Sequence, residues 1–153
     1  QMLLYYLRLN LKILNNFLFK HYVKILLLTL LLTLFLFKNS NKYPWFQGEF
    51  ELAKSVAGNR LIMLDFYADW WLGCRQLDAD TFKDSKLIEL SESFISLKLD
   101  IDIEKNNILS NSFKVNTIPQ NIFVNSNGIE VGRIEGYLPP ELFIKEVEKI
   151  INR

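Results

Sequence analysis

The sequence predicts an α/β fold: a mixed sheet flanked by helices, preceded by one N-terminal transmembrane helix. An apolar stretch near the N-terminus lies between basic residues, as a membrane span does. Beyond it, strand patterns alternate with amphipathic helical patterns, which is typical of a crossover between parallel strands. The last two strand patterns flank Ser126-Asn127-Gly128, and Asn-Gly is the strongest short-range signal for an antiparallel hairpin. A sheet that contains both kinds of pairing is mixed.

The N-terminal part of the chain is divided by its charge and hydropathy. We expect a basic segment at 1–16, a membrane anchor at 17–37, a polar and aromatic linker at 38–48 and a folded domain at 49–153. The anchor ends in the uncharged run ILLLTLLLTLFLF. With the residues from 17 onward it reaches roughly the twenty that ~30 Å of hydrocarbon requires.

The anchor has two alternative interpretations, a cleaved signal peptide and a buried core helix. No small-x-small cleavage pattern follows Phe37, which favours an uncleaved anchor. More basic residues precede the run than closely follow it, so the positive-inside rule places the domain on the extracytoplasmic, periplasmic side of the cytoplasmic membrane. Residue 1 is Gln, and the sequence leaves open whether the chain is a fragment of a longer membrane protein.

The elements of the domain follow from local patterns. Apolar residues at helical spacing predict a helix over 50–57, which Gly58-Asn59 ends. The stretch LIMLDFY, residues 61–67, is apolar except for Asp65 and predicts a buried strand. The further expected elements are helices at 75–79 and 84–91, a strand at 94–102, a helix at 105–113, strands at 120–125 and 129–136, and a final helix that Pro139-Pro140 opens.

The composition argues against several kinds of site. Six of the eighteen basic residues precede Tyr43 and no acidic residue does, so the domain is acidic and lacks the basic face that nucleic-acid binding needs. One Cys and one His cannot form a cluster of metal ligands. There is no Gly-rich phosphate loop and no Gly-x-Ser-x-Gly elbow. We therefore expect no metal, no cofactor and no nucleic-acid partner.

Two stretches carry a family resemblance. MLDFYADWWLGCRQLDADTF, residues 63–82, resembles the active-site segment of thioredoxin-fold proteins, and among them the C-terminal domain of DsbD-type thiol:disulfide interchange proteins. VNTIPQNIFVNSNGIEVGRIEGY, residues 115–137, is similar to that family's cis-proline loop and following hairpin. The resemblance extends from about Trp45 to the C-terminus and implies a thioredoxin-like fold and a redox function.

The resemblance is broken at the first active-site cysteine. Trp71 stands where the family's Cys-x-x-Cys begins, and Cys74 occupies the second, resolving position. Disulfide exchange needs one thiolate that attacks and a second thiol that resolves the mixed disulfide. The sequence thus leaves open whether the chain is an enzyme, and whether Trp71 is authentic or a sequence change. Cys74 is alternatively a small buried hydrophobe.

The resemblance also assigns the other candidate residues. Asp65 matches the family's buried carboxylate, which takes a proton from the resolving thiol. Trp70 matches the aromatic residue before the first cysteine and is alternatively only a packing residue. Ile118 and Pro119 match the loop that offers backbone to an extended substrate, and an ordinary trans proline is the alternative.

Two functions from different classes follow. The first is a membrane-anchored thioredoxin-like protein that acts on a thiol- or disulfide-bearing extracytoplasmic protein, with impaired catalysis. The second is a non-catalytic binding module, whose groove at Pro119 holds an extended polypeptide or a partner domain. A thiol-reagent titration separates them, since an inert, buried Cys74 favours binding.

Overall fold

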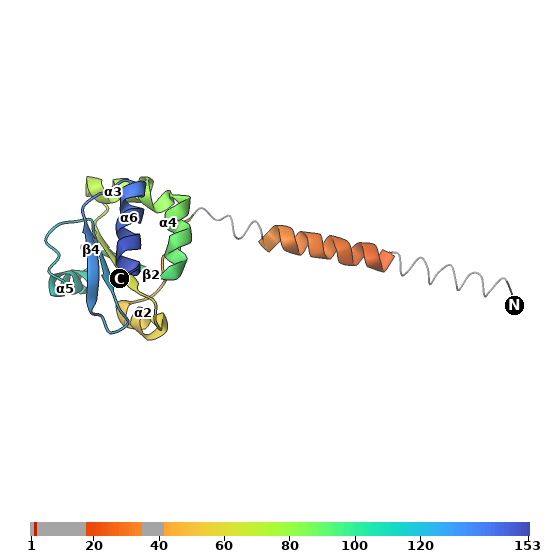
Figure 1. Ribbon diagram of the computed structural model, residues 1–153, viewed down its shortest axis with the longest axis horizontal. Helices are drawn as coiled ribbons and strands as arrows, with labels where there is room; N and C mark the ends of the chain where they lie inside the picture. Colours follow the sequence, from red (N-terminus) through yellow and green to blue (C-terminus); the bar gives the residue numbers. More distant parts are fainter. Residues whose placement is uncertain (1, 3–17, 35–41) are drawn as a thin grey trace. The chain divides into compact units, whose positions relative to one another are not determined.

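The computed structural model describes residue 2, residues 18–34 and residues 42–153. The chain divides into two units, Gln1–Ser40 and Asn41–Arg153. In the first unit, residues 18–34 are helical (Figure 1).

The leader predicted from the sequence is only partly covered by this description. Of the basic segment, all but residue 2 lies outside the described residues, as do residues 17 and 35–37 of the predicted anchor. Among the helices of the described ranges, none has both the length and the apolar character that crossing a membrane requires.

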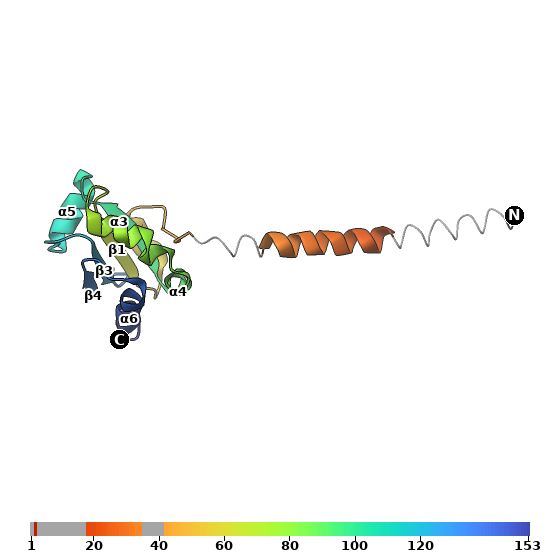
Figure 2. The ribbon, with the colours of Figure 1, turned by 90° about the horizontal axis from the view of Figure 1, so that it is seen from above.

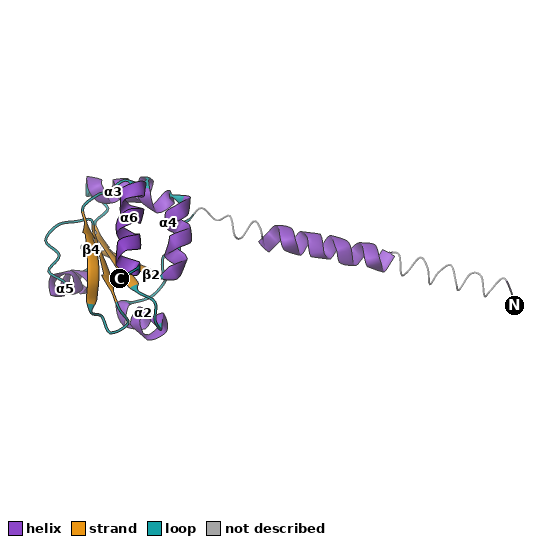
Figure 3. Cartoon of the chain, viewed as in Figure 1, coloured by secondary structure: helices purple, strands orange, loops and turns teal. Residues whose placement is uncertain are grey.

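The second unit contains a four-stranded sheet and the helices that cover it (Figure 3). The strands are β1 (Ile62–Tyr67), β2 (Ile95–Asp100), β3 (Gln120–Val124) and β4 (Glu130–Glu135). The α-helices are α2 (Phe50–Ala57), α3 (Leu72–Ala79), α4 (Ser85–Leu90), α5 (Glu104–Ser112) and α6 (Pro140–Ile151), and the 3₁₀ helices are η1 (Thr81–Lys83) and η2 (Ser91–Ser93). The predicted order of strands and α-helices is confirmed, and the two 3₁₀ helices were not predicted.

The strand order is β2-β1-β3-β4. β1 pairs with β2 in parallel, through a connection that contains α3 and α4, and with β3 antiparallel. β3 and β4 form the antiparallel hairpin that Asn127-Gly128 predicts, and Gly128 has a φ of 80°, which glycine adopts without steric cost. The predicted mixed sheet is confirmed.

Successive side chains of a strand point to opposite faces, so the sheet has two apolar layers. On one face Met63 packs with Leu77 of α3 and Phe143 of α6. On the other face Leu64 packs with alanines of α2, and Leu109 of α5 lies against the same cluster. Figures 1 and 2 accordingly show α5 and α6 on opposite sides of the strands. The core therefore lies in two layers, with the sheet between them.

Tyr43 and Trp45, in a segment interpreted from the sequence as part of a linker, pack against the domain. Tyr43 is 4% exposed, and its hydroxyl oxygen lies 2.9 Å from Oγ of Ser96 in β2. The rings of Tyr43 and Trp45 lie 4.5 Å apart and join the core cluster on the α6 face. Burial of these two aromatic side chains is the physical reason for the difference, because each removes a large apolar surface from water. Residues 38–41 of the predicted linker lie outside the described residues.

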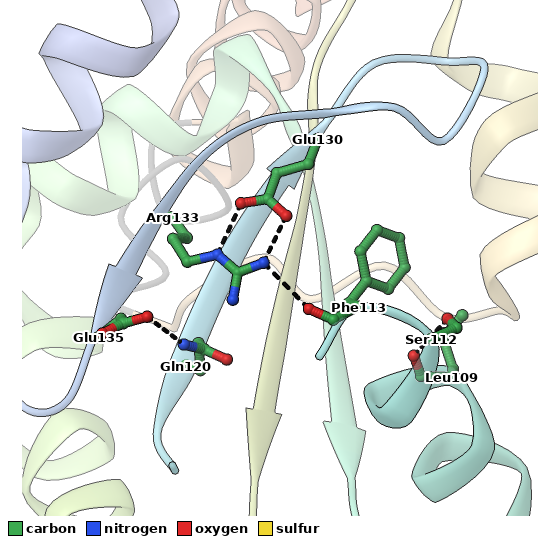
Figure 4. A network of polar contacts seen from close by, with 7 residues as sticks. All are labelled: Leu109, Ser112, Phe113, Gln120, Glu130, Arg133 and Glu135. Carbon is green, nitrogen blue, oxygen red and sulfur yellow. Dashed lines mark hydrogen bonds and ion pairs between the residues drawn. The ribbon is translucent and has the colours of Figure 1, made fainter. Parts of the chain in front are cut away.

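A polar network ties the end of α5 to the β3–β4 hairpin (Figure 4). The guanidinium of Arg133 donates to Glu130 at 2.6 and 2.5 Å and to the carbonyl oxygen of Phe113 at 3.0 Å. Nε2 of Gln120 donates to Oε1 of Glu135 at 2.8 Å, from one strand to the next. These bonds fix both ends of the connection that carries Ile118 and Pro119.

Candidate functional site

The turn between β1 and α3 places the two adjacent tryptophans at the start of a helix. Trp71 is the N-cap residue of α3, with an extended backbone, and its N–H donates to the carbonyl of Ala68 at 3.1 Å. Trp has no side-chain acceptor, so the N-cap makes no side-chain capping bond. A residue at position 71 therefore lies beside the unsatisfied N–H groups of the first helical turn.

Cys74 lies within the first turn of α3, with a side chain that points into the protein. Cys74 is only 3% exposed. Burial raises the pKa of its thiol to about 11, against the lowering effect of a hydrogen bond with the backbone of Ala68, and the nearby carboxyl groups of Asp65 and Asp78 raise it further. Only the thiolate is nucleophilic. A thiol with a pKa raised in this way is protonated at neutral pH.

Asp65 lies in β1 on the sheet face that α3 covers, and it is 2% exposed. Burial raises the pKa of its carboxyl to about 7, the nearby ammonium of Lys98 lowers it, and Asp78 raises it. Lys98 is the cross-strand neighbour of Asp65 in β2 and forms an ion pair with Asp78 of α3. Asp65 can thus gain or lose a proton near neutral pH, as a proton acceptor for a neighbouring thiol must.

The ammonium of Lys98 is held by two aromatic rings in addition to Asp78. It lies 4.5 Å from the ring centroid of Tyr67 and 5.5 Å from that of Trp45. Both are distances at which a cation is attracted to a ring face. Trp45 precedes the first helix of the domain, so the segment before α2 contacts the lysine that neighbours Asp65.

Trp70 and Trp71 are exposed, at 60% and 47%. The indole N–H of Trp70 donates to Oδ2 of Asp102 at 2.8 Å, and the two indole rings meet edge to face, with centroids 5.9 Å apart. Both rings line an open groove of about 390 Å³. The other residues that line it are Ile101, Asn107, Ser110, Asn111, Val115, Asn116, Thr117 and Ile118. None of these side chains is charged, which suits an uncharged stretch of polypeptide.

The loop before β3 packs directly against the first turn of α3. The Ile118–Pro119 peptide bond is cis, the isomer that the resemblance implies. A Cβ atom added to Gly73 would lie only 3.1 Å from Cδ of Pro119, so the backbone at Gly73 lies close to the proline ring. The structure therefore brings Ile118 and Pro119 beside Trp71, and it places Cys74 and Asp65 beneath this surface.

A comparison with known protein families identifies the family that has this fold. The family model of a thioredoxin-like domain matches residues 49–151. The chain belongs to the thioredoxin-like domain family. In this thioredoxin-like domain the Trp-Leu-Gly-Cys segment lies at the start of α3, which follows β1 of the mixed sheet.

Two relatives of the chain are thiol:disulfide interchange proteins. The chain is 32% identical to the thiol:disulfide interchange protein DsbD of Pasteurella multocida over 96 residues, 60% of this chain and 17% of that protein. It is 26% identical to DsbD of Haemophilus influenzae over 116 residues, 72% of this chain and 20% of that protein. The chain thus spans about a fifth of the length of these curated relatives. The predicted relationship to DsbD is confirmed.

Solved structures support the same fold. A thioredoxin from Thermus thermophilus matches with a TM-score of 0.62 and 25% identity, over 72% of this chain and 88% of that chain. A protein described as a putative disulphide-isomerase, from Bacteroides thetaiotaomicron, matches with a TM-score of 0.64 and 25% identity, over 72% and 93%. The DsbH oxidoreductase matches with a TM-score of 0.62 at 16% identity, over 72% and 85%, which shows a shared fold alone.

The thioredoxin-like domain also contains site residues that the sequence did not single out. Asp78 follows Cys74 by four residues, one helical turn, and this spacing alone could have indicated a shared face of α3. Lys98 and Asn121 are the cross-strand neighbours of Asp65, and only the strand register shows this. Within the described parts of the chain no group of three or more His, Cys, Asp or Glu is placed to hold a metal ion.

Proposed function

We propose that this thioredoxin-like domain belongs to a DsbD-type thiol:disulfide interchange system and is itself impaired in catalysis. The observation that carries the proposal is Trp71 at the N-terminus of α3, with Cys74 buried one turn on as the domain's only thiol. Full exchange forms one protein disulfide while it breaks another, and two thiol groups supply the two electrons and two protons. A single buried thiol can at most form a mixed disulfide, which nothing in the domain then resolves.

Cys74 and Asp65 suit the second half of disulfide exchange, in which the resolving thiol attacks the mixed disulfide. Cys74 must lose its proton before its sulfur can attack a mixed disulfide, and the pKa of about 11 shows that this loss is unfavourable without help. Burial raises the pKa of Asp65 to about 7, so its carboxylate form can accept that proton near neutral pH. The proposed partner is a thiol- or disulfide-bearing extracytoplasmic protein.

The reactivity of Cys74 tests the impairment in catalysis, and not the choice between the two functions, because the burial of this thiol makes slow labelling the expected result for both. Because its thiol pKa is about 11 rather than ~8.5, the native chain is expected to react with a thiol reagent at pH 7 about two orders of magnitude more slowly than a free cysteine. The measurement is the rate of thiol labelling, with the chain unfolded in denaturant as the control, in which labelling becomes complete and fast. Native labelling at the rate of the unfolded chain would contradict the impaired-thiol proposal.

The membrane location is part of the same proposal. The helical residues 18–34 carry exposed leucines such as Leu26 and Leu31, at 61% and 62%, as a lipid-facing helix would. The chain is therefore expected to stay in the membrane fraction after alkaline washing, with residues 42–153 open to a protease added outside the cytoplasmic membrane. A soluble product that begins near Asn39 would instead identify the leader as a cleaved signal.

A second candidate function is a binding module without covalent chemistry. The specific observation that favours it is the uncharged groove, which Trp70, Trp71 and Ile118 line with exposed apolar surface. Exposed tryptophans are enriched among the residues that dominate binding energies. An extended extracytoplasmic polypeptide, held by backbone hydrogen bonds beside Pro119, is the proposed ligand.

A further inference from the structure

Two buried polar side chains face each other across β1 and β3. Asp65 pairs with Asn121 in the antiparallel register, so their Cβ atoms lie ~4.5–5.5 Å apart on the same sheet face. They are 2% and 0% exposed. Oδ1 of Asp65, and both Oδ1 and Nδ2 of Asn121, have no hydrogen-bond partner among the described residues. Buried polar atoms are almost always paired, so this pair needs a physical explanation.

Other polar side chains around Asp65 already have ion-pair or hydrogen-bond partners. The ionisable groups that interact with Asp65 come from four elements: Tyr67 of β1, Lys98 of β2, Asp78 and Cys74 of α3, and Tyr43 of the N-terminal segment. Lys98 is paired with Asp78, and the hydroxyl of Tyr43 is bonded to Ser96. Asn121 is therefore the polar side chain of β3 that lies next to Asp65 without a bond of its own.

A side-chain amide can hydrogen-bond a neighbouring carboxyl group in both of its charge states. An asparagine side chain carries a donor and an acceptor of nearly equal size, and a turn about its last torsion exchanges them without a change in volume. Toward an ionised carboxylate it donates from Nδ2, and toward a protonated carboxyl group it accepts at Oδ1. A leucine in its place would fill the core but serve neither form.

We propose that Asn121 is a positioning residue whose side-chain amide, unpaired in this structure, turns toward Asp65 and hydrogen-bonds it in both its ionised and its protonated form. When Cys74 becomes a thiolate, the proton passes to a carboxylate oxygen of Asp65, and the amide of Asn121 turns from donor to acceptor. When the thiol re-forms, the proton returns and the amide turns back. The hydrogen bond itself depends only on Asp65 and Asn121, while the use of the proton rests on the proposed function.

The test is the titration of Asp65 in the full chain. The midpoint is measured from the carboxyl ¹³C chemical shift, in Asn121→Leu and in the unaltered protein. The ionised form loses the stronger, charge-assisted hydrogen bond, so the midpoint is expected to rise by about one pH unit in Asn121→Leu. The matched control is Gln120→Leu, which removes the neighbouring buried amide of β3 on the opposite sheet face, where Gln120 bonds Glu135 (Figure 4). Its midpoint is expected to stay within a few tenths of a unit.

An unchanged midpoint in a folded Asn121→Leu protein overturns the proposal, as does an equal rise in both variants. If Asn121→Leu does not fold, the side-chain amide resonances of Asn121 decide in the unaltered chain. They are expected to move with pH at the midpoint of Asp65 and to stay constant in Asp65→Asn, and resonances that stay constant in both overturn the proposal. These readouts need no turnover, so a failure of the disulfide-interchange proposal would leave their result intact.

Discussion

Replacement of Trp71 by cysteine is expected to convert the chain into a protein-disulfide reductase. Residue 71 is the N-cap of α3 and 47% exposed, with Cys74 one turn further on and Asp65 beneath. A thiol at such a helix start has its pKa lowered into the range of ~3.5 to 7.5 by the N–H groups of the first turn and the helix dipole. The new dithiol is expected to have a reduction potential between ~−270 and ~−120 mV.

The effect on turnover is expected to be large. Loss of a nucleophile costs enzymes ~10⁴-fold or more, so recovery of even part of it should raise the reduction rate ~10³-fold over the unaltered chain. The measurement is reduction of a model protein disulfide with an excess of a thiol donor. Two controls separate the roles of the residues: Trp71→Ser removes the indole without adding a thiol, and Trp71→Cys with Cys74→Ser attacks but cannot resolve.

The same variants separate the two candidate functions. If the groove is a binding site and Trp71 one of its dominant residues, Trp71→Cys and Trp71→Ser should both weaken a partner's affinity by ~2 kcal/mol. Restored turnover in Trp71→Cys supports a damaged oxidoreductase. A folded Trp71→Cys protein that forms the 71–74 disulfide and still fails to exchange it would reject that interpretation and favour the binding module.

The sequence predicted the local structure well where a few neighbouring residues determine it. The helix at 50–57 has the predicted bounds, and Asn127-Gly128 marks the hairpin that the structure contains. The 3₁₀ helices at 81–83 and 91–93 were missed because they carry no periodic pattern. The packing of Tyr43 and Trp45 was missed for another reason: a polar and aromatic segment with a proline looks the same whether it is solvated or packed.

The same distinction applies to the residues of the candidate site: sequence motifs predicted some of them, and only the tertiary structure shows the others. Asp65, Ile118 and Pro119 were predicted as site residues because they match positions in the two stretches that resemble the family. The ion pair between Lys98 and Asp78 depends on how β2 lies beside β1 and on the face that α3 turns toward the sheet. Local sequence patterns predict neither the register of β1 and β2 nor the side of α3 that packs on the sheet. Site residues outside the motif were therefore identified only from their contacts in the structure.

Asp65 is also expected to make stability fall as the pH rises. Its carboxyl has a pKa of about 7 in the folded domain, against ~3.9 in the unfolded chain. Between these values the folded state holds a proton that the unfolded state has lost, so the free energy of unfolding decreases with pH. The stabilisation is complete below about pH 4 and is lost as the pH passes 7, at up to ~1.4 kcal/mol per pH unit. Over this window the loss reaches at most ~4 kcal/mol.

Asp65→Asn removes the titrating group and should remove this slope. The measurement is the free energy of unfolding from denaturant titrations of the full chain between pH 4 and pH 8. The difference between the variant and the unaltered protein is used because other carboxyl groups contribute equally to both. The variant is expected to gain stability relative to the unaltered chain as the pH rises, since an uncharged amide replaces a carboxyl that must otherwise ionise inside the core.

Asp69→Asn, at an exposed position of the adjacent turn, is the control and should keep the slope. If Asp65→Asn and the unaltered chain lose stability in parallel between pH 5 and 7, Asp65 does not titrate there and cannot serve Cys74 as a proton acceptor near neutral pH.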